Sequence, residues 1–111
     1  MPQSSVSIHV ISDSLGETGE MVARAAASQF EPGIFRIERL PKVTSAVELR
    51  ETVDQHCGGS CIFFYTLVDR VLRTEMERLC DEGVNGVDLL GPAVALLQEA
   101  TGFSSMGEAG I

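Results

Sequence analysis

Strand-like and helix-like apolar patterns alternate four times along the 111 residues of this chain. After each strand-like segment, apolar residues recur at helical spacing. This alternation is typical of parallel βαβ units, so the sequence predicts an α/β fold, a three-layer sandwich with helices on both faces of a four-stranded parallel sheet. The predicted strands are residues 6–12, 34–40, 61–65 and 87–90, and the helical spacing covers residues 15–30, 46–57, 68–80 and 94–100.

The order of the strands follows from how apolar each segment is. Residues 61–65 (CIFFY) form an unbroken apolar run, which suits a strand that is buried on both faces. Residues 34–40 (IFRIERL) carry three charges and are therefore expected at an edge of the sheet. With right-handed crossovers these features favour the order 2-1-3-4, a Rossmann-like or flavodoxin-like arrangement.

In that order the chain changes direction across the sheet between the first and third strands. The loops that follow these two strands, residues 12–18 and 66–69, then flank one crevice, which is where open α/β sheets usually bind ligands. Residues 12–18 (SDSLGET) offer hydroxyls, a glycine and a helix N-terminus, a combination that can cradle a phosphate. The simpler interpretation is that Ser14 and Glu17, at a capping-box spacing, only cap the helix, and the spacing alone favours it.

Carboxylates near two other helix starts have similar alternatives. Asp69 is a candidate N-cap of the third helix. Asp88, at the carboxyl end of the fourth strand, either faces the crevice or bonds to the backbone of the adjoining loop. The candidate residues for ligand or domain contact are Ser12, Asp13, Ser14, Gly16, Glu17, Thr18, Thr66, Asp69 and Asp88.

Motifs for nucleotide chemistry and metal binding are incomplete in this sequence. Neither a G-x-x-x-x-G-K-[S/T] phosphate loop nor a G-x-G-x-x-G fingerprint occurs, so we expect no catalytic residue and no cofactor in these 111 residues. Cys57 and Cys61 have a C-x-x-x-C spacing next to His56 but lack a second pair of ligands, so we expect no metal site. Cys61 is expected to be a buried, reduced thiol, and His9 to have a structural role.

Composition excludes several classes of protein. The formal net charge is −8, with one Lys and seven Arg, which argues against binding to nucleic acid. No apolar run approaches the roughly 18–20 residues that a membrane span requires, and the first residues carry no positive leader. The odd number of cysteines, three, indicates reduced thiols. We therefore expect a cytoplasmic protein.

Several segments, in this order and spacing, resemble the N-terminal part of the pyruvate, phosphate dikinase regulatory protein family, also called the phosphoenolpyruvate synthetase regulatory proteins. The resemblance runs over residues 7–102, with Leu15 and Gly19 standing where the family has Thr and Ala. The segments are residues 11–14 (ISDS) with 16–18 (GET), 29–30 (QF), 65–69 (YTLVD) and 87–92 (VDLLGP).

The resemblance implies a regulatory protein with two opposing activities. Members are ADP-dependent kinases that inactivate the dikinase or synthetase on a Thr, and phosphate-dependent phosphorylases that remove that group and release pyrophosphate. Because the family's Walker-type loop lies in a C-terminal half, we expect residues 1–102 to be a non-catalytic N-terminal α/β domain. Residues 103–111 are then a flexible tail or the start of a linker to a missing C-terminal domain. ADP and phosphate belong to the full-length protein, and the implied partners are the target enzyme, the missing domain and a second copy in a homodimer.

Two other hypotheses stay open from the sequence. The first is a free-standing flavodoxin-like module that binds phosphate or flavin through the Ser/Thr-rich loop at residues 12–18, although Trp is absent and Tyr65 is the only Tyr. The second is a phospho-receiver domain, which needs an Asp where Tyr65 and Thr66 end the third strand, and it ranks last.

Overall fold

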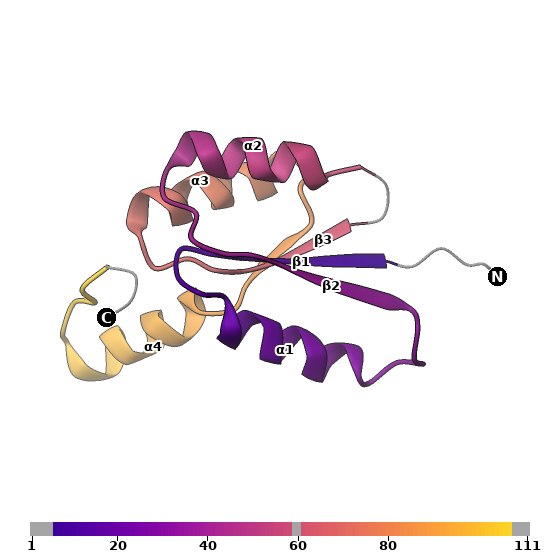
Figure 1. The fold of residues 1–111 in the computed structure, drawn as a ribbon. Helices are drawn as coiled ribbons and strands as arrows, with labels where there is room; N and C mark the ends of the chain where they lie inside the picture. The colour runs from indigo at the N-terminus through magenta and orange to yellow at the C-terminus, as the bar shows by residue number, and fades with distance from the viewer. Residues whose placement is uncertain (1–5, 59–60, 108–111) are drawn as a thin grey trace.

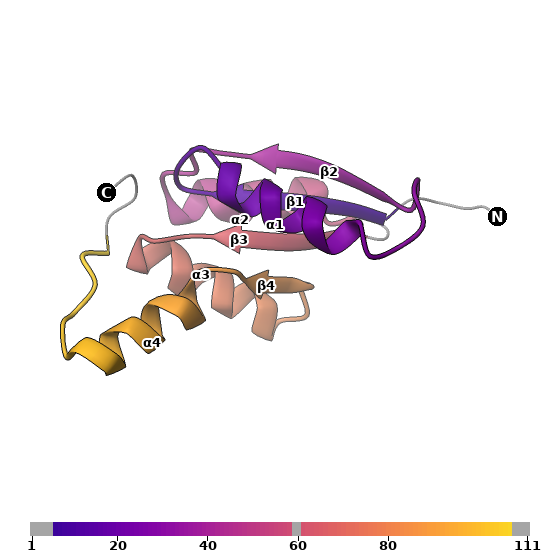
Figure 2. The ribbon, with the colours of Figure 1, turned by 90° about the horizontal axis from the view of Figure 1, so that it is seen from below.

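A computed structural model describes residues 6–58 and 61–107 of the chain. Its four strands form one parallel sheet in the order β2-β1-β3-β4, which confirms the predicted topology (Figures 1 and 2). The elements, in chain order, are β1 (Val6–Ser12), α1 (Glu17–Ala27), β2 (Phe35–Leu40), α2 (Ala46–His56), β3 (Cys61–Thr66), α3 (Arg70–Asp81), β4 (Gly86–Asp88) and α4 (Gly91–Thr101).

Helices cover the two faces of the sheet unequally. Helices α2 and α3 lie side by side on one face, and α1 covers β1 and β2 on the other (Figures 1 and 2). Successive residues of β1 point to opposite faces, so Val10 packs in the small cluster under α1 and Ile11 packs in the larger cluster under α2 and α3. Phe63 of β3 lies at the centre of that larger cluster and is fully buried.

Helix α4 extends away from the sheet, beyond the carboxyl ends of the strands (Figure 2). Leu96 and Leu97, two members of its predicted apolar stripe, are consequently exposed. The face of β3 on the α1 side is only partly covered as a result, so Phe64 is half-buried and burial on both faces is not complete. Cys61, expected to be buried, is also half-buried, and its thiol is free.

The end of β4 differs from the prediction that residues 87–90 form the strand. The strand stops at Asp88 because the Asp88 carboxylate accepts hydrogen bonds from the backbone N–H groups of Leu90 (3.0 Å) and Gly91 (2.7 Å). These bonds turn the chain directly into α4. At the other end of that helix, the N–H of Ser105 donates to the side chain of Gln98 at 2.8 Å. Of the proposed tail at residues 103–111, the last four residues lie outside the described ranges.

Candidate functional site

A small cleft of about 200 Å³ lies at the carboxyl ends of β1 and β3, where the sequence predicted a crevice. Its volume is below the roughly 300 Å³ at which sites for drug-sized ligands begin. The cleft can therefore hold a phosphate group or one side chain rather than a whole nucleotide. It is lined by Ser12, Asp13, Ser14, Leu15, Gly16, Glu17, Thr18, Thr66, Val68 and Leu90.

Asp13 holds the two loops of the cleft together. One carboxylate oxygen, Oδ2, accepts hydrogen bonds from the backbone N–H groups of Val68 (2.9 Å) and Asp69 (2.8 Å), which belong to the loop after β3. The other oxygen, Oδ1, is buried and has no hydrogen-bond partner within residues 6–58 and 61–107. Because buried polar atoms are rarely left without a partner, this oxygen is an unused hydrogen-bond acceptor at the cleft.

The start of α1 shows that the capping interpretation of Ser14 and Glu17 is wrong. The N-cap is Gly16, in the left-handed conformation at φ 84°, and no side chain among the described residues caps the helix. Ser14 lies two residues before this N-cap, and its backbone N–H donates to Ser12 Oγ at 2.9 Å in a local turn. The backbone N–H groups at the start of α1 therefore have no side-chain cap among the described residues, although Glu17 and Glu20 in the first turn complement the helix dipole.

Two basic residues that sequence reasoning did not assign to the site contact this loop, Arg39 through its side chain and Lys42 through its backbone. The Arg39 guanidinium donates to the carbonyl oxygen of Leu15 at 3.1 Å and also pairs with Glu20. The backbone N–H of Lys42, a residue with a positive φ of 58°, donates to the carbonyl oxygen of Ser14 at 2.9 Å. Parallel pairing of β1 with β2 brings the end of β2, which carries Arg39, and the following Lys42 to the same edge of the sheet as residues 12–18. The predicted strand order could therefore have indicated that these two residues lie near the cleft.

The remaining predicted site residues divide between the cleft and the helix caps. Thr66 is buried and lines the cleft. The Asp69 carboxylate caps α3, as predicted, by accepting from the N–H groups of Val71 (2.9 Å) and Leu72 (3.2 Å). Asp88 bonds to the adjoining backbone, with its second oxygen 3.7 Å from Arg73, and does not line the cleft. Of the two alternatives for Asp88, the structural one is therefore correct.

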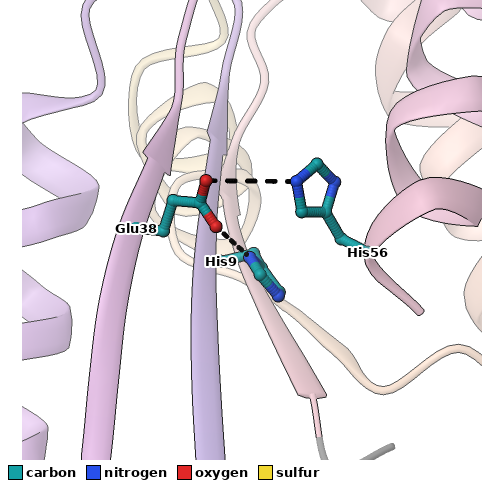
Figure 3. Close-up of side chains that lie close together, drawn as sticks. All are labelled: His9, Glu38 and His56. Atoms are coloured by element: carbon teal, nitrogen blue, oxygen red, sulfur yellow. Dashed lines mark ion pairs between the residues drawn. The ribbon is translucent and has the colours of Figure 1, made fainter. Parts of the chain in front are cut away.

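A second cluster of titratable groups lies between the sheet and α2, away from the cleft. His9 of β1, Glu38 of β2 and His56 at the end of α2 point toward one another (Figure 3). Nδ1 of His9 is 3.2 Å from one oxygen of Glu38, and Nε2 of His56 is 4.0 Å from the other. Burial lowers the pKa of His9 below its usual value, and His56 lowers it further, so His9 is neutral near pH 7.

Comparisons with known proteins agree with the resemblance in the sequence. A family model described as Kinase/pyrophosphorylase matches residues 8–111. A pyruvate, phosphate dikinase regulatory protein of Desulfitobacterium hafniense is 40% identical over 97 residues, which cover 86% of this chain and 36% of the relative. Its counterpart in Carboxydothermus hydrogenoformans is 38% identical over 95 residues, 85% of this chain and 34% of the relative.

The chain thus spans little more than a third of the length of these curated relatives. The comparisons do not favour the alternative of a free-standing flavin or phosphate module, and none of the described residues that line the cleft is aromatic. Within the described ranges, no helix combines the length and the apolar character that crossing a bilayer requires.

Proposed function

Because the chain belongs to the kinase/pyrophosphorylase family, we propose that it forms the N-terminal α/β domain of a regulatory protein for pyruvate, phosphate dikinase or phosphoenolpyruvate synthetase. The full-length protein would phosphorylate its target on a Thr with ADP and remove that phosphate with inorganic phosphate. The names of the relatives support the dikinase as target. The two activities and the synthetase as alternative target rest on the family resemblance.

Within that protein we assign the cleft to binding a phosphate group. The observation that carries this assignment is the uncapped N-terminus of α1, held against the loop after β3 by Asp13. Free N–H groups and the helix dipole favour an anion at such a position. The hydroxyls of Thr18 and Thr66 add donors around it.

The negative charge of Asp13 and Glu17 is the main factor that opposes phosphate binding in the cleft. Contacts within the loop reduce this effect. Two backbone N–H groups engage one oxygen of the Asp13 carboxylate, Oδ2, and so offset part of its negative charge. Glu17 adds negative charge at the rim, but the segments that carry Arg39 and Lys42 lie against the same loop. A phosphate at the helix N-terminus would therefore meet donors on several sides, and the unpartnered Oδ1 of Asp13 would accept from a hydroxyl of the same ligand.

Replacing Thr18 and Thr66 by Val in a full-length protein that carries this chain tests the assignment. Each change removes one hydroxyl and keeps the shape of the side chain. A hydrogen bond to a charged group contributes about 1.5–3 kcal/mol, so each variant is expected to lower phosphate-dependent turnover by about tenfold or more. The measurement is transfer of labelled phosphate to and from the dikinase.

Two controls accompany these variants. Thr74→Val makes the same change on the exposed surface of α3 and should leave both activities unaltered. The isolated 111-residue chain should show neither activity, because its sequence has no Walker-type loop. If the Thr18 and Thr66 variants fold and retain full phosphate-dependent turnover, the assignment of the cleft is wrong.

A further inference from the structure

The cluster of His9, Glu38 and His56 has the dimensions of a metal site. The atoms that could serve as ligands all lie within 4.8 Å of one another. In a tetrahedral zinc site each nitrogen or oxygen ligand is about 2.0–2.1 Å from the metal, so neighbouring ligands are about 3.4 Å apart. His9 Nδ1 lies 3.2 Å from one Glu38 oxygen and His56 Nε2 lies 4.0 Å from the other, so both imidazoles approach the carboxylate to near this separation. Because the Glu38 side chain is exposed, a small rotation would bring its carboxylate within bonding distance of a metal held by the two imidazoles.

A backbone contact of His56 selects the tautomer of its neutral ring that a metal ligand requires. Its Nδ1 lies 2.8 Å from the carbonyl oxygen of Thr52. A carbonyl can only accept, so Nδ1 carries the hydrogen and, in the neutral ring, Nε2 presents its lone pair toward the Glu38 carboxylate (Figure 3). A backbone carbonyl behind the ring is a common second partner of metal-binding histidines. Two electron-rich atoms that face each other in this way are stabilised by a cation between them.

His9 supplies the second, independent observation. Its side chain is only 7% exposed, and its Nδ1 has no hydrogen-bond partner in the described part of the chain. The nearby Glu38 oxygen is close enough but not aligned as a hydrogen-bond acceptor. A buried ring nitrogen without a partner, aimed at a carboxylate, is an unfilled coordination position as well as an unfilled hydrogen bond.

We propose that His9, Glu38 and His56 bind one zinc-class divalent cation, with the remaining coordination position open to solvent. Two imidazoles and one carboxylate form a donor set that suits Zn²⁺ with an open fourth position. Glu38 is 53% exposed and His56 is 27% exposed, so the ion has a path in from the surface. The net charge of −8 also favours a cation. The ion would tie β1, β2 and α2 together at a place separate from the phosphate cleft.

Titration of the 111-residue chain with Zn²⁺ against a chromogenic chelator tests this proposal. We expect one equivalent to bind, and the melting temperature to rise, because the native state alone assembles the three ligands. Glu38→Gln and His56→Gln should each weaken binding by more than about tenfold, the lower limit of what even an outer partner of a ligand contributes. Both side chains are partly exposed, so these variants are expected to fold.

Matched controls separate this site from adventitious binding. Glu31→Gln, the same change at an exposed position, and Cys57→Ser, which removes the exposed thiol next to His56, should both keep full affinity. With Co²⁺ as probe, the visible spectrum should lack a thiolate charge-transfer band. The proposal is overturned if the wild-type chain binds no stoichiometric ion. It is equally overturned if binding survives Glu38→Gln and His56→Gln, or is lost in Cys57→Ser. None of these outcomes depends on the phosphate cleft.

Discussion

Replacing Asp13 by Ala is expected to lower the free energy of unfolding by about 3 kcal/mol, because two hydrogen bonds to a charged group are lost at about 1.5–3 kcal/mol each. Their donors, the N–H groups of Val68 and Asp69, would lose their acceptor at the junction of two loops. Loss of the unpartnered Oδ1 offsets part of this effect, since that buried atom is itself unfavourable. Denaturant unfolding followed by circular dichroism measures the change.

Two further variants show whether the effect comes from the loop contact. Asp13→Asn keeps an accepting oxygen without the charge. Each of the two hydrogen bonds should weaken by about 1 kcal/mol, the difference between a charged and a neutral acceptor, so the variant should lose about 2 kcal/mol. Asp54→Ala removes an exposed carboxylate on α2 and should change stability by no more than about 0.5 kcal/mol. If Asp13→Ala is as stable as the Asp54 variant, Asp13 does not hold the two loops together.

Replacing Phe63 by Ala is expected to be the most destabilising single change, at about 3–5 kcal/mol. The ring is fully buried in the cluster between the sheet and α2 and α3. It also packs against His9, with ring centroids 5.3 Å apart. Truncation leaves a cavity at the centre of the sheet, and a domain of ordinary stability, about 5–15 kcal/mol, would lose a large part of its margin.

The matched control is Phe103→Ala, which removes the same ring from a position that is 77% exposed. Its effect on the free energy of unfolding should lie within about 0.5 kcal/mol. Equal midpoints for the two Phe variants would mean that β3 is not the centre of the core.

The strand order could be predicted from the sequence because it depends on bulk properties of whole segments. The charged residues of β2 placed it at an edge, and the apolar run of β3 placed it inside. The same order brought residues 12–18 next to the loop after β3, as the contacts of Asp13 show. Such features depend on averages over several side chains, so a wrong prediction for one residue does not change the predicted strand order.

Features that depend on the conformation of one residue were not predictable in this way. The spacing of Ser14 and Glu17 is that of a capping box, yet the left-handed Gly16 moves the helix start past Ser14. The cluster of His9, Glu38 and His56 is invisible to motif spacing for a different reason. Its members come from three elements, so no short stretch of sequence contains more than one of them.

Nuclear magnetic resonance of the isolated chain tests most directly whether the cleft binds phosphate. Amide resonances are followed while inorganic phosphate or ADP is added, with sodium chloride at equal ionic strength as the reference. We predict saturable shifts confined to residues 14–19 and 66–68, around the N-terminus of α1 and the loop that Asp13 holds against it. Shifts that match those in sodium chloride, or that cluster elsewhere on the described surface, would contradict the assignment of this cleft.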